Sequence, residues 1–367
     1  MRISYYNSRM IQAAILGTCM LNNEVSQTQI DHMLGLILTG RLIGCPGPMN
    51  RCQPGLFKFD CTPLPDQWTT DQTFEQICLT TARICWHRAN DRPIRLFWSG
   101  GIDSTVALVA LILTNDRWQN QLEIYTTPHA VEQEYPWFYQ NFLRQAQVSV
   151  LDILDLFRPS LYQDGRYCVD GSCGDQLWGS VILSELEGLY QEPWHKLYEL
   201  DIFHRTVGSS SRIPTINYID LLVSQFSSTV RTVSDLAWLL NFTHKWDYSG
   251  RKWMGRVRDA SLFFTGMHSF FNHTSFQQWA LSNPDIKIGR TFTSYKQPAK
   301  DFIYKFTRDN HYRVHKTQKS SVQWSFNPGT TWRDVHWITL MTAQGYYRTI
   351  EDDLNQDWPS WCFQVPE

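Results

Sequence analysis

The middle of the chain alternates short apolar runs with segments whose apolar positions repeat at helical spacing. Each apolar run is too short for a helix and ends at turn-forming residues, which is typical of a buried strand. The predicted strands are residues 94–98, 122–127 and 148–153. The predicted helices are residues 74–87, 106–113 and 135–147. Because this alternation requires right-handed parallel crossovers, the sequence predicts an α/β fold with a doubly wound parallel sheet that binds ligands at the carboxyl ends of its strands.

The pattern differs on either side of this region. Residues 1–73 carry two possible helices, at 11–21 and 29–38, before a loop rich in proline and glycine. After residue 192 helical patterns dominate, for example at 231–242, and the end of the chain is rich in tryptophan. We therefore expect a mostly helical C-terminal region after the sheet.

Composition narrows the possible partners. The 367-residue chain has a formal net charge of −2 and no dense run of lysine or arginine, so we expect no nucleic-acid partner and no anionic membrane surface. No stretch approaches the roughly 18 consecutive apolar residues of a membrane-spanning helix. The nine cysteines are irregularly spaced, which is typical of reduced thiols and predicts a cytoplasmic protein. Cys45, Cys52 and Cys61 lie in one loop, where a zinc site is a hypothesis, but they lack the close pairs that such sites use.

The turn between the first predicted strand and its helix carries candidate chemistry. Residues 99–104 read Ser-Gly-Gly-Ile-Asp-Ser, and Ser104 with Thr105 is predicted to cap the helix. The glycines allow a tight turn, and backbone N–H groups at the positive end of a helix dipole attract anions. The carboxylate of Asp103 would repel a phosphate unless a divalent cation lay between them. The turn therefore predicts a site for a metal-bound polyphosphate.

A second turn repeats this design. A short predicted strand ends in small residues at 171–174, and Asp175 and a predicted helix at 177–189 follow. Because the carboxyl ends of neighbouring parallel strands meet at one edge of a sheet, the two turns would bring Asp103 and Asp175 around one cation. Carboxylate oxygens of this kind suit Mg²⁺.

Both turns resemble known signatures. Residues 99–104 resemble the pyrophosphate-binding loop Ser-Gly-Gly-x-Asp-Ser of the PP-loop ATP pyrophosphatases, which cleave ATP between its α and β phosphates. They do not resemble a Walker loop, because no Gly-Lys-Ser/Thr follows. Residues 171–179 resemble the second signature of the asparagine synthetase family, Gly-Glu-Gly-x-Asp-Glu-Leu-Phe-Gly. The identical positions are Gly171, Asp175, Leu177 and Gly179.

Of the four other fixed positions, Gln176 and Trp178 match the second signature in shape, and two positions depart from it. Ser172 stands where the family carries an acidic residue, or a tyrosine in the related β-lactam synthetases, that helps to handle protons on the nucleophile. Cys173 stands where a glycine is usual. The chain therefore resembles the family at the residues that would bind ATP and differs from it at the residues that would meet the nucleophile.

Two weaker resemblances follow. Residues 269–276 resemble the family's Pro-Phe-Leu-Asp segment, with Asn272 in place of its aspartate. Residues 311–319 resemble its Arg-x-Lys segment, whose lysine neutralises charge at the reacting centre. By spacing Lys316 is the best match and Lys319 the alternative, although two solvated lysines near a helix end would give the same pattern.

The resemblance covers residues 74–319. It implies the synthetase domain of the family without its glutaminase domain, because Arg2 stands where that domain has its catalytic cysteine. The predicted parts are an N-terminal region of unknown role at 1–73, a PP-loop ATP-binding domain at 74–192, a helical substrate-side region at 193–330 and a Trp-rich C-terminal tail at 331–367.

The resemblance implies an ATP-dependent ligase that forms amides with ATP and Mg²⁺. A carboxylate attacks the α phosphorus of ATP to give an acyl-adenylate and pyrophosphate, and an amine then displaces AMP. Asp103 and Asp175 would hold the metal, and Lys316 would act with them in catalysis. The nucleotide would contact Ser99, Gly100, Gly101, Asp103, Ser104 and Gly171. Without a glutaminase, the nitrogen would come from free ammonia, a substrate amine or a separate ammonia-supplying protein.

Two other functions stay open. Cys168 and Cys173 flank the second turn, where a thiolate could carry sulfur as in the thiolating pyrophosphatases, although a cysteine within a strand is usually a small buried apolar group. A non-catalytic nucleotide-binding module is suggested by Ser172. Asp103 and Asp175 argue against that module, because a site without a reaction has no need of metal ligands.

Overall fold

The chain forms two compact units in the computed structural model. The sheet unit consists of Leu64–Val181 and Ser261–Thr330, and the terminal unit of Met1–Pro63, Ile182–Ala260 and Thr331–Glu367. The structure describes residues 2–4, 69–152, 161, 166–172, 174–178, 188–199, 216, 219–220, 223–224, 226, 230–239, 267–283, 294–316, 337–341 and 347–351. The sheet unit therefore combines chain from both sides of residue 192, where the sequence pattern alone placed the end of the sheet.

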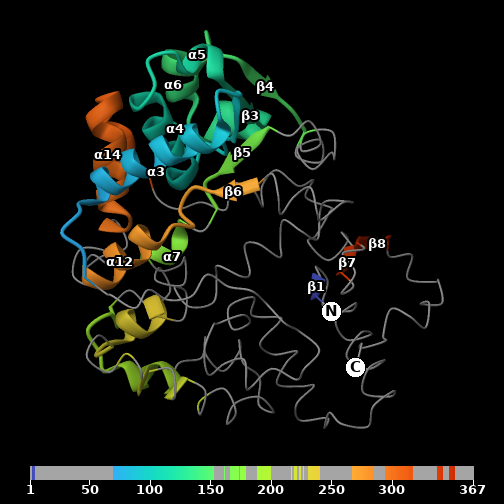
Figure 1. The fold of residues 1–367 in the computed structure, drawn as a ribbon. Coiled ribbons are helices and arrows are strands. Elements are labelled where there is room, and N and C mark those ends of the chain that lie inside the picture. Colours follow the sequence, from blue (N-terminus) through green and yellow to red (C-terminus); the bar gives the residue numbers. More distant parts are fainter. Residues whose placement is uncertain are drawn as a thin grey trace. The chain divides into compact units, whose positions relative to one another are not determined.

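A five-stranded parallel sheet forms the centre of the sheet unit (Figure 1). In spatial order the strands are β4 (Val148–Val150), β3 (Leu122–Thr126), β2 (Ile94–Phe97), β5 (Tyr167–Asp170) and β6 (Met267–Ser269). The chain runs outward from β2 through β3 to β4 and then returns to the other side of β2 for β5 and β6. The direction of winding reverses between β2 and β5, where an open α/β sheet leaves a crevice at its carboxyl edge. The predicted α/β class and parallel sheet are confirmed, and the strand order is compatible with a doubly wound fold.

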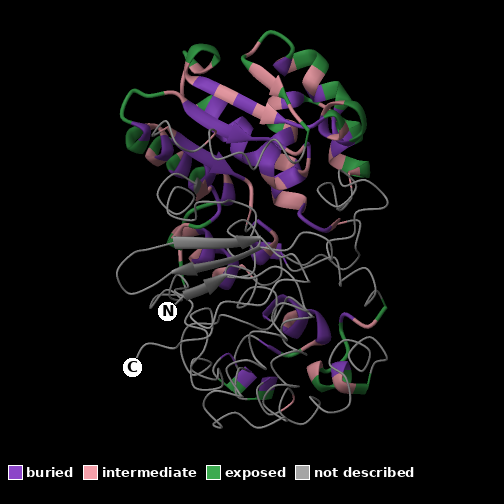
Figure 2. Cartoon of the chain, turned by 90° about the vertical axis from the view of Figure 1, so that its right-hand side faces the viewer, coloured by how far each residue is buried: buried purple, intermediate pink, exposed green. Residues whose placement is uncertain are grey.

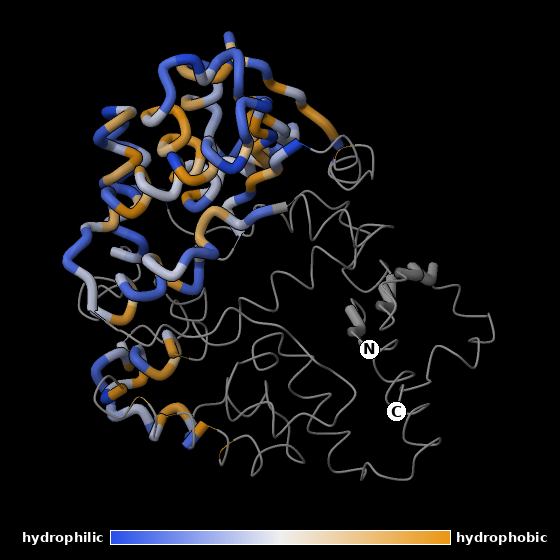
Figure 3. Tube along the Cα trace, in the orientation of Figure 1, coloured by the Kyte–Doolittle hydropathy of each residue, from blue (hydrophilic) through white to orange (hydrophobic). Residues whose placement is uncertain are grey.

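Helices α3 (Phe74–Ala89), α4 (Ile102–Leu113) and α14 (Gln297–Thr307) pack around this sheet. Helix α3 contacts β2, β5 and α4, and α14 contacts both α3 and α4. All residues of β2 and β5 are buried, and every residue of α4 except Asp103 and Leu113 is buried (Figure 2). A helix that is apolar on all sides requires such a buried position. In Figure 3 hydrophobic segments accordingly run through the interior of the sheet unit.

Aromatic residues join the second turn to the helices around it. The ring of Phe74 lies 5.1 Å from that of Trp178 and 5.3 Å from that of Trp279, measured between centroids. Phe276 and Phe302 complete the cluster, at 5.9 and 6.5 Å from Phe74. These rings connect α3 and α14 with α7 (Asp175–Trp178) and α12 (Thr274–Ser282). They therefore fix the start of α7, where Asp175 lies, relative to α14.

The connection from β3 to β4 is less regular than predicted. The expected helix at 135–147 consists of α6 (Pro136–Phe138) and the π-helical turn η3 (Tyr139–Leu143), and a further π-helical turn, η2 (Ala130–Glu134), precedes them. Tyr135 adopts φ −149° and ψ 62°, outside the helical region, because the ring of Pro136 disfavours helical backbone in the residue before it. This break places Glu134 at the end of a separate turn.

Two predicted details are wrong. Helix α4 begins at Ile102 with Gly101 as its N-cap, and Ser104 and Thr105 lie inside the first turn, where their hydroxyls donate to the Gly101 carbonyl oxygen at 3.2 and 2.8 Å. The predicted Ser104–Thr105 cap is thereby corrected. Strand β6 lies in a stretch where helices were predicted, and it pairs with β5 in parallel. The predicted helices at 11–21 and 29–38 and the loop with Cys45, Cys52 and Cys61 lie outside the described residues.

The terminal unit contains a second, smaller sheet. Strands β1 (Arg2–Ser4), β7 (Trp337–Met341) and β8 (Tyr347–Glu351) pair antiparallel in the order β1-β7-β8. The Trp-rich tail, for which the sequence pattern predicts no element, thus supplies two strands. No helix among the described residues is both long and apolar enough to cross a membrane.

Candidate functional site

The first turn is held by its own hydroxyls at the end of β2. Gly100 adopts φ +72°, a left-handed conformation that favours glycine. The Ser104 hydroxyl accepts from the Ser99 N–H at 3.1 Å, and the two serine hydroxyls share a hydrogen bond of 3.0 Å. The turn leads directly into the first turn of α4, where backbone N–H groups and the helix dipole favour an anion. The residues predicted to bind phosphate are therefore together at the positive end of a buried helix.

The second turn lies directly against the first. A Cβ atom at Gly171 would lie 2.5 Å from the backbone nitrogen of Ser104 and 2.6 Å from its Cα. A Cβ atom at Gly174 would lie 2.3 Å from the carboxyl carbon of Asp103. Only a residue without a side chain fits at these two positions. The close approach brings Asp175, the next residue, beside Asp103.

One ammonium group joins the two predicted metal ligands. Lys296 Nζ donates to Asp103 Oδ2 and to Asp175 Oδ1, each at 2.6 Å. The lysine side chain is only 2% exposed, and the Tyr295 hydroxyl also donates to Asp175 Oδ1, at 3.4 Å. Burial by itself lowers the pKa of Lys296, but the charges of Asp103 and Asp175 outweigh it and raise that pKa above its usual 10.5. Lys296 therefore stays charged, and the two carboxylates converge on a single cation.

The same pair of carboxylates fits Mg²⁺. Two oxygens that contact one nitrogen atom already point at one position, and Mg²⁺ prefers hard oxygen ligands of this type. Among the described residues no group of three or more His, Cys, Asp or Glu side chains could hold a metal ion. The protein would thus contribute Asp103 and Asp175, and phosphate and water oxygens would supply the other ligands, as is usual for Mg²⁺ at a polyphosphate.

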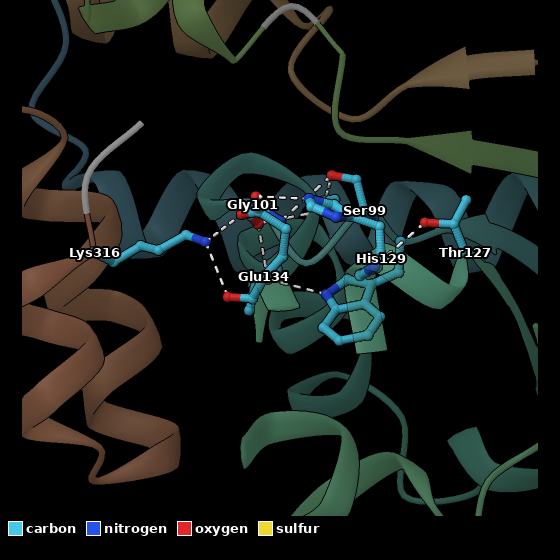
Figure 4. Close-up of polar contacts among 10 residues, drawn as sticks. Ser99, Gly101, Thr127, His129, Glu134 and Lys316 are labelled. Atoms are coloured by element: carbon cyan, nitrogen blue, oxygen red, sulfur yellow. Dashed lines mark hydrogen bonds and ion pairs between the residues drawn. The ribbon is translucent and has the colours of Figure 1, made fainter. Parts of the chain in front are cut away.

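Lys316 reaches the first turn through Glu134 (Figure 4). It follows α15 (Asn310–His315), and its Nζ donates to the Glu134 carbonyl oxygen at 3.0 Å and forms an ion pair with the Glu134 carboxylate. His129 Nε2 lies 3.2 Å from the other oxygen of that carboxylate. The Glu134 Cβ would be 2.7 Å from a Cβ at Gly100, so Glu134 lies against the turn itself. Lys316 therefore contacts Glu134, and Glu134 in turn lies against the first turn.

Two stacked tyrosines hold α15 in place for this contact. The rings of Tyr135 and Tyr312 are 3.8 Å apart and nearly parallel, and the Tyr135 hydroxyl donates to Asp309 at 3.2 Å. Lys316 Nζ lies 5.7 Å from the Tyr312 ring centre, within reach of a cation–π interaction. Burial, and next the charge of Asp309, raises the pKa of Tyr135, so it stays neutral. Tyr135 follows Glu134 directly, so one short segment contacts both the lysine and its helix.

Of the remaining candidates from the sequence, the structure describes Cys168 and Ser172. Cys168 is fully buried in β5, in register with Arg95 of β2. The Ser172 hydroxyl donates to the carboxylate of Asp170, the last residue of β5, at 2.7 Å. Cys173 and Lys319 lie outside the described residues.

Sequence reasoning missed Lys296 and Glu134. Lys296 is the N-cap of α14, with φ +58°, and no feature of the local sequence distinguishes it from nearby lysines. Glu134 is one of several polar residues in a run after β3. Their roles depend on which distant groups they meet, and only long-range contacts could have identified them.

Comparison of the chain with protein-family models, with curated protein sequences and with solved structures finds no match.

Replacing Gly171 by alanine should separate the two turns. The added Cβ meets the Ser104 backbone, which cannot move without shifting α4, so we expect the unfolding free energy to fall by about 3 kcal/mol. Gly188→Ala is the control, because its Cβ would meet no atom within 4 Å and only its φ of +93° is strained, at about 1 kcal/mol. Denaturant unfolding measures both, and an equal loss in the two variants would contradict the close approach of the turns.

Replacing Lys296 by methionine should leave two carboxylates repelling each other. We expect the unfolding free energy without divalent cations to fall by about 3 kcal/mol, the scale of a broken buried ion pair, and Mg²⁺ to restore part of it. Because the folded-state pKa of Lys296 lies above 10.5, its contribution is present at neutral pH and is lost only in strongly alkaline solution. Lys305→Met, which breaks an exposed pair with Glu75, is the matched control and should change little. Equal stability of the two variants would refute the role of Lys296.

Proposed function

We propose that this protein is an ATP-dependent carbon–nitrogen ligase that releases AMP and pyrophosphate. One observation carries the proposal: Asp103 and Asp175, from turns after two adjacent strands, converge on one cation beside a glycine turn at a helix N-terminus. An isolated glycine turn would not need this pair of carboxylates. A metal-bound polyphosphate accounts for both the anion site and the acids.

The sheet supports assignment to the PP-loop ATP pyrophosphatases and, within them, to asparagine synthetase-like synthetases. Both resemblance motifs lie at the carboxyl edge, on either side of the point where winding reverses between β2 and β5. Open α/β sheets bind their ligands at that point. The proposal thus combines the sequence resemblance with the position of the two motifs in the sheet.

Each group at the turn has a proposed task. Ser99, Gly100, Gly101 and Ser104 would bind the β and γ phosphates, and Asp103 and Asp175 would hold Mg²⁺. When bound, this ion would neutralise the charge that develops on pyrophosphate as it leaves. Gly171, which follows β5, would lie against the adenosine. Lys296 would keep the two aspartates in position until the metal takes its place between them, and would then add positive charge near the phosphates.

The reaction would proceed in two displacements. A substrate carboxylate oxygen attacks the α phosphorus, the bond between the α and β phosphates breaks, and pyrophosphate leaves. An amine nitrogen then attacks the acyl carbon, and AMP leaves with the electron pair of the broken carbon–oxygen bond. Lys316 would neutralise negative charge at phosphorus and then at the tetrahedral centre, and Glu134 would fix its orientation.

The placement of Cys168 argues against this residue as a sulfur carrier, whereas Cys173, the other candidate, lies outside the described residues. Its thiol is completely buried between strands, and its Sγ lies 3.7 Å from the Leu161 carbonyl oxygen. A sulfur carrier needs an accessible thiolate with a lowered pKa. The proposed partners are therefore a small-molecule carboxylate and an amine or ammonia, which a separate protein could supply.

The products of the reaction test the proposal most directly. We expect Mg²⁺-dependent exchange of labelled pyrophosphate into ATP with one acid from a carboxylic acid panel, because adenylation is reversible before the amine enters. Chromatography should then show AMP and pyrophosphate as products of the complete reaction. Formation of ADP and phosphate would refute the assignment to this class.

Lys316→Ala should reduce kcat/KM by the equivalent of about 3–4 kcal/mol, the scale of a lost oxyanion donor. Because this change leaves Glu134 as a buried unpaired charge, the Lys316→Ala/Glu134→Gln double variant shows whether lost activity reflects chemistry or unfolding. Cys168→Ser and Lys305→Ala serve as controls and should keep full activity. Loss of activity in Cys168→Ser with normal adenylation would favour sulfur transfer instead.

A further inference from the structure

A buried carboxylate lies one residue before the second turn. Asp170 ends β5 and is 3% exposed. Its Oδ1 accepts hydrogen bonds from the Ser172 hydroxyl at 2.7 Å and from the Ser172 N–H at 3.2 Å. Its Oδ2 is buried and has no hydrogen-bond partner among the described residues. A carboxylate with one oxygen left unsatisfied in this way is costly to bury, which suggests a purpose other than stability.

The amide-forming step requires a group that takes up a proton. When an amine nitrogen bonds to an acyl carbon, it must lose one proton, and a positioned base typically accelerates such a transfer. Ser172 is partly exposed in the turn between Gly171 and Asp175, and its hydroxyl already donates to Asp170. The Ser172 main chain is held from the other side, because the Ser269 hydroxyl donates to its carbonyl oxygen. The serine hydroxyl therefore connects the candidate site with a buried base.

We propose that Ser172 and Asp170 form a proton relay that deprotonates the attacking amine. This inference rests on the proposed ligase function. As the carbon–nitrogen bond forms, a proton passes from nitrogen to Ser172 Oγ, and the Ser172 hydroxyl proton passes to Asp170 Oδ1. The carbon–oxygen bond to AMP then breaks, and AMP leaves with the bonding electrons. Asp170 afterwards returns the proton through Ser172 to water. Ser172 is the residue that touches the nucleophile, and Asp170 acts through it.

The environment of Asp170 suits this task. Burial raises its pKa from 3.8 to about 6, and the two hydrogen bonds from Ser172 oppose the rise. In register beside it, β2 presents Phe97 and β6 presents Ser269, neither of them charged. A carboxyl group with this pKa is deprotonated at neutral pH and is a stronger base than an ordinary aspartate.

The titratable groups on the strands around Asp170 lie further from the turn. Arg95 of β2 and Cys168 of β5 are in register two residues before Phe97 and Asp170. Arg95 pairs with Glu123 of β3, at 3.3 Å. His268 of β6 stacks on the ring of Tyr167, at 4.1 Å. Burial and Ser172 account for the shift in the Asp170 pKa, so the expected pH dependence belongs to Asp170 and not to these groups.

The test separates adenylation from amide formation. The acid is the one that supports pyrophosphate exchange. The nucleophile is ammonium chloride or, in parallel, hydroxylamine, whose nitrogen becomes much more acidic than that of ammonia once it bonds to the acyl carbon and can lose its proton directly to water. Asp170→Asn should keep exchange and hydroxamate formation within about threefold of wild type and should lower amide formation from ammonia by about 100-fold or more. Ser172→Ala should behave in the same way, and the double variant should lose no more than either single one, because the two residues act as a unit. Cys168→Ala is the matched control in β5.

The pH profile gives a second readout. The relay needs the carboxylate form of Asp170, so the rate of amide formation in the wild type should rise with pH through about 6. Asp170→Asn should lose this rise. It should keep the separate rise with pH that comes from the deprotonation of ammonium. Asp170→Glu should restore part of the activity. Normal amide formation in Asp170→Asn, or an equal loss in exchange and amide formation, would overturn the relay and leave Asp170 a structural residue of the turn. Absence of exchange in the wild type would refute the ligase function itself, and the relay with it.

Discussion

The electrostatic pairing of Asp103 and Asp175 around Lys296 determines the arrangement of the carboxyl edge. Two carboxylates this close repel each other unless a cation lies between them, and Lys296 provides that cation at 2.6 Å from each. Buried ion pairs contribute little net stability compared with apolar packing. Their concentration where two strands end is therefore the observation on which the proposed ligand site rests.

Packing and charge cooperate to bring this pair together. Gly171 and Gly174 let the second turn touch the first, while the aromatic cluster around Phe74 joins the start of α7 to α14. The segment that starts with α14 then returns to the first turn at Lys316, where the stacked tyrosines orient it. Residues 296–316 thus include two lysines with separate acidic partners: Lys296 pairs with Asp103 and Asp175, and Lys316 pairs with Glu134. The two lysines have different tasks in the proposed reaction.

The second turn differs from the first in the type of group it offers. The first turn presents backbone and hydroxyl groups that α4 holds in place. The second turn offers a serine bonded to a buried aspartate instead of an exposed acid. In the proposed function, this arrangement would keep a basic group near the reaction and would limit the number of bare negative charges beside a polyphosphate, which would otherwise weaken its binding.

Local spacing determined much of the fold in advance. The three predicted strands, the helix at 74–87 and the glycine turn are all present, because each depends on side chains within a few residues of one another. The sequence likewise places Asp103 and Asp175 after small-residue turns at the carboxyl ends of parallel strands, so both lie at one edge of the sheet. That they meet there depends on the strand order, which puts β5 beside β2 although β3 and β4 lie between them in the chain.

Tertiary structure decided the rest. Helix α4 starts at Ile102 because Gly101 can cap it and the two hydroxyls satisfy the Gly101 carbonyl, a choice that local preference for serine caps does not reveal. The partners of strand β6, Lys296 and Glu134 are far away in the sequence. Ser269 of β6 contacts Ser172, 97 residues away, and Lys296 contacts Asp103, 193 residues away. Glu134 contacts Lys316, 182 residues away. Contacts over such separations depend on which elements pack together, and the apolar pattern records only that an element is buried, not what it is buried against.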